Sequence, residues 1–120
     1  MILSIWFHDI IYDPKSKENE RKSAEIFQNF CEDEKLKNDV SAIILATIKH
    51  QPPDGEYPDC LLEFLDLDLS VLGWPSAEYS DYAQRVRFEY QHIPDPDFVK
   101  GRTQVLNHLK SLNNSQIFFT

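Results

Sequence analysis

The dipeptide His8-Asp9 offers the clearest catalytic chemistry in the sequence. It interrupts an otherwise apolar run from Ile2 to Tyr12. If this run is helical, His8, Asp9 and Tyr12 fall within one sector of roughly 100°, and aliphatic and aromatic residues cover the rest. Burial of an imidazole beside a carboxylate is costly unless a partner satisfies both groups. A divalent metal ion would be such a partner, and a buried His–Asp hydrogen bond without metal is the alternative.

A second candidate ligand lies in the predicted helix over residues 59–72. On a helical wheel, Asp68 is about 140° from Glu63, which places it in the middle of the apolar face. Asp66 shares the polar side with Glu63, so we expect it to be solvated. A lone aspartate at the centre of a core-facing stripe is unusual. Metal ligation would explain Asp68, and the alternative is a structural carboxylate that caps another helix or pairs with an arginine.

Two further polar residues continue core-facing stripes. His50 lies seven residues after Ile43, at the end of a predicted helix, where a hydrogen-bonded histidine is also favoured by the helix dipole. Glu20 lies seven residues before Phe27, where it is either a functional carboxylate or an ordinary first-turn acid. Sequence spacing alone leaves both alternatives open for each residue.

Arg102 is the basic counterpart of these acids. It lies among Phe98 and Val105 on the last predicted helix. A buried guanidinium needs an anion. That anion is either a structural carboxylate such as Glu89 or the phosphate of a substrate.

The elements that must position these residues are predicted to be helices. Apolar residues recur at helical spacing, no segment alternates convincingly with period two, and proline or glycine separates most segments. The predicted helices cover about residues 2–12, 18–31, 34–50, 59–72, 76–91 and 97–111. The fold class is therefore all-α, a compact bundle of about six helices that forms one domain over residues 1–120.

Composition excludes several classes of function. The net charge is -8 and the pI is about 4.8, which argues against nucleic-acid binding because that requires a basic face. No apolar run approaches the ~20 residues of a membrane span, and the apolar start has no basic region before it, so we expect neither membrane insertion nor a signal peptide. Cys31 and Cys60 have no metal-finger or redox spacing, so we interpret them as free thiols in a reducing cytoplasm.

An ordered series of motifs resembles the HD superfamily of predicted metal-dependent phosphohydrolases, and more narrowly a small bacterial-type subgroup of it. The His-Asp dipeptide alone is a weak signal, but the series is specific and covers nearly the whole chain. The matching motifs are Trp6-Phe7-His8-Asp9-Ile10-Ile11-Tyr12-Asp13, Asn19-Glu20, Ala46-Thr47 with His50, the run from Phe64 to Gly73, Arg87-Phe88-Glu89-Tyr90, Gly101-Arg102 with Val105-Leu106, and Ile117-Phe118-Phe119-Thr120.

The resemblance implies an HD-type helical bundle around a divalent metal ion: Mn, Fe, Ni, Zn or Mg. In the superfamily the ligands are a first histidine, the His-Asp pair and a later aspartate. His8 and Asp9 match the pair, and Asp68 matches the late aspartate. The family's first helices, one of which carries the first histidine, and its last helix have no counterpart here. His50 is a candidate for the missing nitrogen ligand.

The sequence thus favours a metal-dependent phosphohydrolase that acts on a small phosphate ester such as a nucleotide. Glu20 is the candidate general base or water-orienting residue, and Arg102 and Lys49 are candidates for steadying the phosphate. We expect a small phosphorylated substrate, no nucleic-acid or membrane partner, and leave a homodimer open. The alternative is a catalytically inactive HD-like domain that serves as a protein-interaction module.

Overall fold

The computed structural model describes residues 1–112, and within this range every regular element is a helix. The prediction of an all-α fold with about six helices is confirmed. In chain order the elements are α1 (Ile2–Phe7), α2 (Asn19–Phe30), α3 (Glu34–Ala46), α4 (Leu61–Asp68), the 3₁₀ helix η1 (Ser70–Gly73), α5 (Ser76–Glu89) and α6 (Asp95–Ser111). None of these described helices is both long and apolar enough to cross a membrane.

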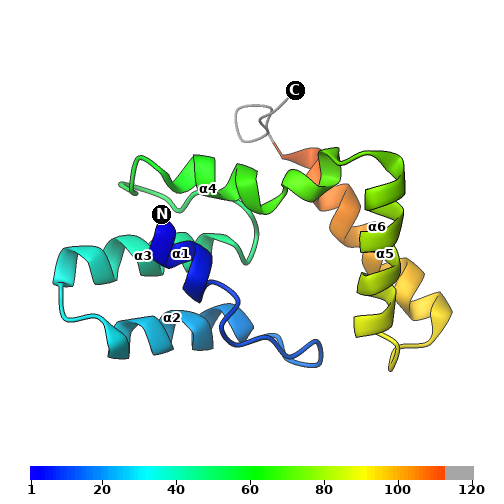
Figure 1. Ribbon diagram of the computed structural model, residues 1–120, viewed down its shortest axis with the longest axis horizontal. Coiled ribbons are helices and arrows are strands. Elements are labelled where there is room, and N and C mark those ends of the chain that lie inside the picture. The colour runs from blue at the N-terminus through cyan, green and yellow to red at the C-terminus, as the bar shows by residue number, and fades with distance from the viewer. Residues whose placement is uncertain (113–120) are drawn as a thin grey trace. The chain divides into compact units, whose positions relative to one another are not determined.

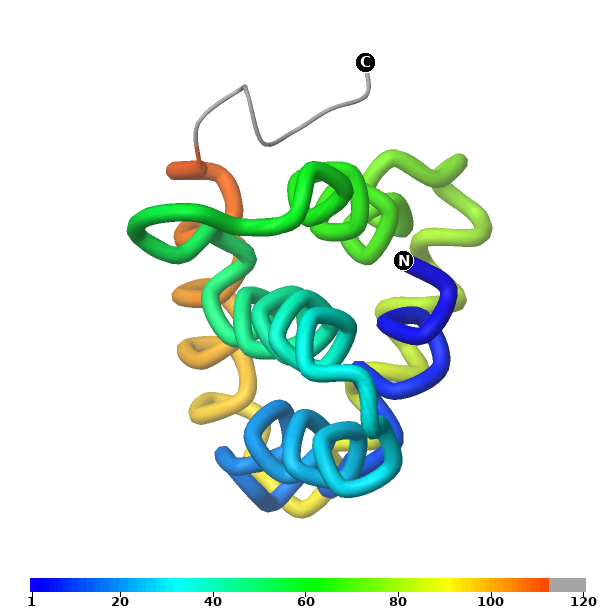
Figure 2. The backbone as a smooth tube through the Cα atoms, turned by 90° about the vertical axis from the view of Figure 1, so that its left-hand side faces the viewer, coloured from blue at the N-terminus to red at the C-terminus, as the bar shows by residue number. Residues whose placement is uncertain are grey.

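The chain divides into two compact units, residues 1–67 and 68–120, each with most of its contacts inside itself. The prediction of one HD-type domain over residues 1–120 stays a prediction. In the first unit α1 contacts both α2 and α3, and α2 packs closely against α3. Figures 1 and 2 show α3 lying between α2 and α4. Asp33 begins α3 as its N-cap, because its side chain accepts a hydrogen bond from the amide of Leu36 at 2.9 Å.

The core of the first unit has two parts, and α3 contributes to both. Towards α2 it buries Val40 and Ile44 against Ala24 and Phe27. The Phe7 ring of α1 meets Phe27 edge to face, with 5.0 Å between ring centroids. Phe27, which was predicted to lie on the core-facing stripe of this helix, is buried as expected.

Towards α4 the same helix buries a different side. Ile43 and Ala46 pack against Leu61, Phe64 and Leu65 of α4. Apolar residues on two sides of α3 explain why it is the central helix of this unit, since a helix that buries both sides needs a partner on each. Each large core side chain contributes on the order of 1.5–3 kcal/mol through burial.

Three predicted helices end earlier than expected. The fourth ends at Asp68 rather than at residue 72, and the 3₁₀ helix η1 follows it. The first ends at Phe7 rather than near residue 12, and the residues after it form turns that pack by hydrogen bonds onto α2. The third ends at Ala46 rather than at residue 50. At this end the hydroxyl of Thr47 donates to the carbonyl of Ile44 at 2.6 Å. His50 has a positive φ of 52°, so it lies off the helical face on which the sequence placed it.

The second unit contains η1, α5 and α6. Pro75 and Pro94 precede α5 and α6, and no residue of either helix is fully buried. Arg87 ties the two helices together at their connection. Its guanidinium donates to the carbonyls of Tyr90 at 2.9 Å and Ile93 at 3.0 Å, and it pairs with the Asp95 carboxylate at 2.5 Å. The connection is therefore fixed by one side chain.

Two buried serines of the first unit predict opposite stability effects. Ser4 and Ser23 are both fully buried, but the Ser4 hydroxyl has no hydrogen-bond partner among the described residues. Ser23 accepts from the amide of Ile11 at 3.1 Å and donates to its carbonyl at 3.3 Å. Ser4→Ala should raise the free energy of unfolding by about 1 kcal/mol, and Ser23→Ala should lower it by about 1–2 kcal/mol. Urea unfolding measures both, and a destabilised Ser4→Ala would contradict this burial pattern.

Candidate functional site

His8 lies at the carboxyl end of α1 and caps it with both backbone and side chain. Its amide donates to the carbonyl of Ser4 at 2.9 Å. The ring Nδ1 lies 3.0 Å from that carbonyl and 3.1 Å from the carbonyl of Ile5. A carbonyl oxygen can only accept, so Nδ1 carries a proton. In the neutral ring the lone pair is therefore on Nε2.

The Nε2 atom of His8 faces its neighbour in the sequence. It lies 3.3 Å from Oδ2 of Asp9. The His8 side chain is 18% exposed and also meets the Phe64 ring edge to face, with 5.4 Å between centroids. The Asp9 side chain is 63% exposed, so the expectation that both members of the pair are buried is wrong for Asp9. Tyr12 is also exposed.

The donor set of this pair fits a divalent metal ion as two of its ligands. Two ligand atoms about 2.1 Å from one ion lie about 3.0 Å apart at a right angle and about 3.4 Å apart at the tetrahedral angle. The observed separation of Nε2 and Oδ2 falls between these values. The bonds from Nδ1 to backbone carbonyls are the kind of outer contact that orients a histidine ligand. Without metal, the same geometry suits an imidazolium paired with the carboxylate.

The segment that follows the pair is held by the first turns of α2. Besides the two bonds between Ser23 and Ile11, the side chain of Asn19 accepts from the amide of Asp13 at 3.0 Å and donates to its carbonyl at 2.9 Å. Glu20 is the next residue of that turn and is partly buried. The structure thus ties the chain after His8-Asp9 to the turn that carries Glu20. Asn19 and Ser23 have this positioning role, which no periodicity in the sequence reveals.

The other candidates of the first unit lie after α3. Lys49 is exposed and His50 is partly buried in the turn that follows the helix. The backbone of His50 is left-handed, so its side chain does not lie on the face of α3. A helical wheel assumes right-handed helix geometry and therefore cannot predict this position. Each of the two side chains makes an interaction within the structure.

Of the two aspartates of α4, Asp66 departs from the prediction and Asp68 does not. Asp68 is the last residue of the helix and is partly buried. Asp66, expected to be solvated, is partly buried, and its Oδ1 atom is fully buried with no hydrogen-bond partner among residues 1–112. Burial, and next the charge of Glu63, raise the pKa of Asp66 from 3.8 to about 6. The apolar face on which the sequence placed Asp68 is nevertheless the buried one, since Leu61, Phe64 and Leu65 are all buried.

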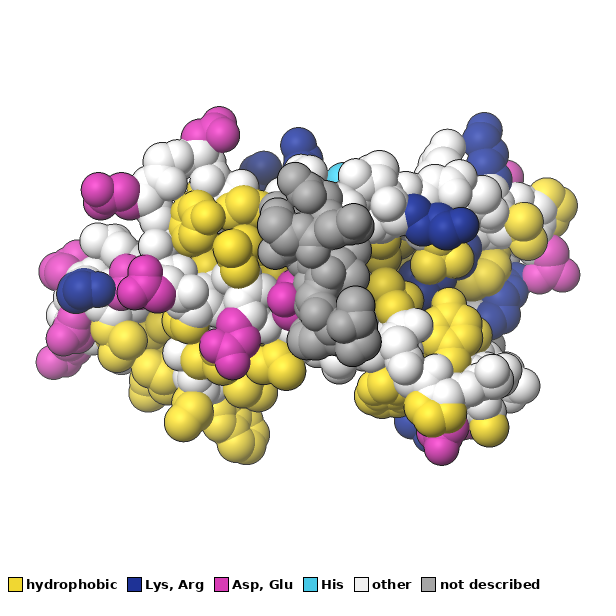
Figure 3. All heavy atoms as spheres, turned by 90° about the horizontal axis from the view of Figure 1, so that it is seen from above, with side chains coloured by type: hydrophobic (Ala, Val, Ile, Leu, Met, Phe, Trp, Pro, Cys, Tyr) yellow, Lys and Arg dark blue, Asp and Glu magenta, His cyan; other side chains and the backbone are white. Residues whose placement is uncertain are grey.

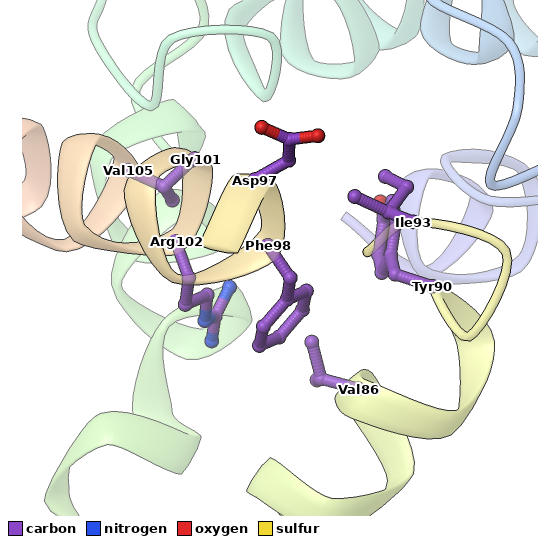
Figure 4. Close-up of a pocket in the computed structure, with 8 residues that line it drawn as sticks. All are labelled: Val86, Tyr90, Ile93, Asp97, Phe98, Gly101, Arg102 and Val105. Atoms are coloured by element: carbon purple, nitrogen blue, oxygen red, sulfur yellow. The ribbon is translucent and has the colours of Figure 1, made fainter. Parts of the chain in front are cut away.

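Arg102 lines a pocket of the second unit together with residues of α5 and α6 (Figure 4). It is partly buried. The expected pairing with Glu89 is not seen, and Glu89 makes another interaction. Arg87, for which the sequence indicated no separate role, pairs with Asp95 instead, and its guanidinium carbon lies 4.5 Å from the centre of the Phe98 ring.

Across the described part of the chain, no three His, Cys, Asp or Glu side chains are grouped closely enough to form a metal site. His8 and Asp9 are the pair that the structure does bring together. Cys31 and Cys60 are free thiols, as expected. Comparison with family models, curated proteins and solved structures finds no match to this chain.

Proposed function

We propose that the chain is a metal-dependent phosphohydrolase for a small phosphate ester, with His8 and Asp9 as ligands of a divalent metal ion. One observation carries the proposal. Nδ1 of His8 is committed to backbone carbonyls, so Nε2 is left beside the Asp9 carboxylate at a separation suited to shared coordination. The resemblance to the HD superfamily adds Asp68 as a further ligand.

The residues of the first unit have distinct tasks in this proposal. When bound, the metal ion supplies Lewis-acid polarisation of the phosphoryl oxygen and acidifies water. Glu20 accepts a proton from the attacking water or orients it. Asn19 and Ser23 fix the segment that follows the ligands, and so limit the motion of His8 and Asp9 relative to α2. Lys49 is the candidate cation of this unit for the substrate phosphate, and Arg102 is a separate candidate in the second unit.

Metal binding tests the proposal directly. We expect Mn²⁺, Ni²⁺ or Zn²⁺ to raise the melting temperature of the metal-stripped protein, because an ion that binds only the folded state stabilises it. His8→Gln and Asp9→Asn should each lower the affinity at least about tenfold, and Asp68→Ala tests the third ligand in the same way. Isothermal titration calorimetry measures the affinities.

His92→Gln is the matched control, since it removes an exposed imidazole of the second unit. It should leave metal affinity unchanged. Equal affinity in wild type, His8→Gln and Asp9→Asn would remove the basis for the metal site. The His8–Asp9 contact would then be an ion pair that caps α1.

The structure also gives one reason to consider an interaction module. Large apolar side chains of the first unit are exposed: Ile2 is 71%, Trp6 74% and Phe30 66% exposed. Figure 3 shows hydrophobic side chains at the molecular surface. Surfaces of this kind often bind a protein partner. A protein that binds no metal and hydrolyses no phosphate ester would favour this second function.

A further inference from the structure

The connection between α5 and α6 is braced from within the second unit. Arg87 bonds to the carbonyls of Tyr90 and Ile93 and to the side chain of Asp95. Its guanidinium also lies over the Phe98 ring. These contacts join the last turn of α5, the connection and the first turn of α6, so the walls of the neighbouring pocket are held in place without a ligand.

That pocket has a volume of about 230 Å³. Most of its wall is apolar, with Val86 contributed by α5, Tyr90 by the C-cap of that helix, and Phe98 and Val105 by α6. A space of this size is smaller than most pockets for drug-sized ligands, so it suits a compact molecule. The wall predicts that the body of the ligand is aromatic or aliphatic.

Charge in the pocket comes from two residues that point in opposite directions. In Figure 4, Arg102 and Phe98 extend from α6 toward Val86, whereas the carboxylate of Asp97 points the other way. Arg102 has no hydrogen-bond or ion-pair partner among the residues that the structure describes. A partly buried guanidinium is stabilised by an anion, and its fork of donors matches a carboxylate or phosphate.

We propose that this pocket binds a small organic oxyanion, a carboxylate or phosphate carried on an aromatic or aliphatic body, with Arg102 holding the charged end. The proposal rests on the proposed function only in assigning Arg102 to an anion, and it needs no metal ion. Binding can therefore succeed where metal binding or hydrolysis fails, and can fail where they succeed.

Ligand titrations on the metal-stripped chain test the proposal. NMR spectra monitor the amide resonances of residues 86–105 during each titration. Phenyl phosphate and phenylacetate distinguish the two anions, while benzyl alcohol and inorganic phosphate each lack one half of the expected ligand. We expect at least one phenyl anion to bind about tenfold more tightly than both partial ligands, with the Gly101 resonance shifted. Equal binding of benzyl alcohol or of inorganic phosphate, or no binding at all, would overturn the proposal.

Three variants locate the site. Arg102→Gln should weaken binding at least about tenfold, whereas Lys100→Gln removes an exposed charge of the same helix and should not. Gly101→Leu should block binding, because Gly101 lines the pocket and a leucine side chain would fill part of it. The protein should tolerate the change, because no atom lies within 4 Å of a Cβ at this position. This variant should fold stably, since leucine is the better helix former. Unchanged affinity in both Arg102→Gln and Gly101→Leu would place any binding elsewhere.

Discussion

Glu20→Gln should lower the metal-dependent hydrolysis of phosphate esters by about 10²–10⁴-fold and leave the affinity for the metal ion unchanged. The glutamine has the shape of the glutamate but cannot accept the proton of the attacking water, and general-base catalysis contributes a rate factor of this size. Steady-state kinetics on a nucleotide panel with Mn²⁺, Co²⁺, Ni²⁺ and Mg²⁺ measures the effect. A fall in kcat with little change in KM is the expected signature.

The same substitution distinguishes catalysis from helix stabilisation. Glu20 lies in the first turn of α2, where an acid stabilises the helix by about 0.3–1 kcal/mol through the dipole. If that were its whole role, Glu20→Gln would lower the melting temperature slightly and leave kcat intact. Glu25→Gln, on the exposed side of the same helix, is the control and should change neither. A metal-loaded wild type without activity would favour the interaction module.

Asp66→Asn should raise the free energy of unfolding at pH 7.5 by about 2 kcal/mol. A carboxylate oxygen of Asp66 is buried without a hydrogen-bond partner among the described residues, and its pKa is raised to about 6. A pKa raised from 3.8 to about 6 would correspond to about 3 kcal/mol in a fully buried group, and solvent screening of this partly exposed residue lowers the cost to about 2 kcal/mol. Asparagine of the same shape carries no charge to bury.

The pH dependence follows from the direction of the shift. Between about pH 4 and pH 6 the folded chain holds the Asp66 proton more tightly than the unfolded chain, so this residue makes stability fall as the pH rises through that window. Above about pH 6 its penalty is constant. Asp66→Asn should remove this contribution to the dependence of the free energy of unfolding on pH. Asp54→Asn, in an exposed turn, should not. Urea unfolding from pH 4 to pH 8 measures both, and parallel curves for wild type and Asp66→Asn would contradict the burial of Asp66.

Local chemistry determined the helical elements. The periodicity of α2, the Asp33 cap of α3 and the breaks at Pro52-Pro53 and Pro94 act within a few residues, so they can be recognised without the fold. The inner face of α2 was predicted for the same reason, because its apolar residues fall in one stripe. The His8-Asp9 pair was also visible in the sequence as a polar interruption of an apolar run.

Tertiary structure decided how these elements end and which sides they bury. The first helix ends at Phe7 because the residues after it bond to α2 through Ser23 and Asn19, partners that lie ten or more residues away from His8. The helical wheel placed Asp66 in solvent, yet one of its oxygens is buried. The predicted apolar face of α4 is buried, so the burial of an atom outside that face depends on which neighbours pack against it. Such packing joins residues far apart in the chain, and no local pattern records it.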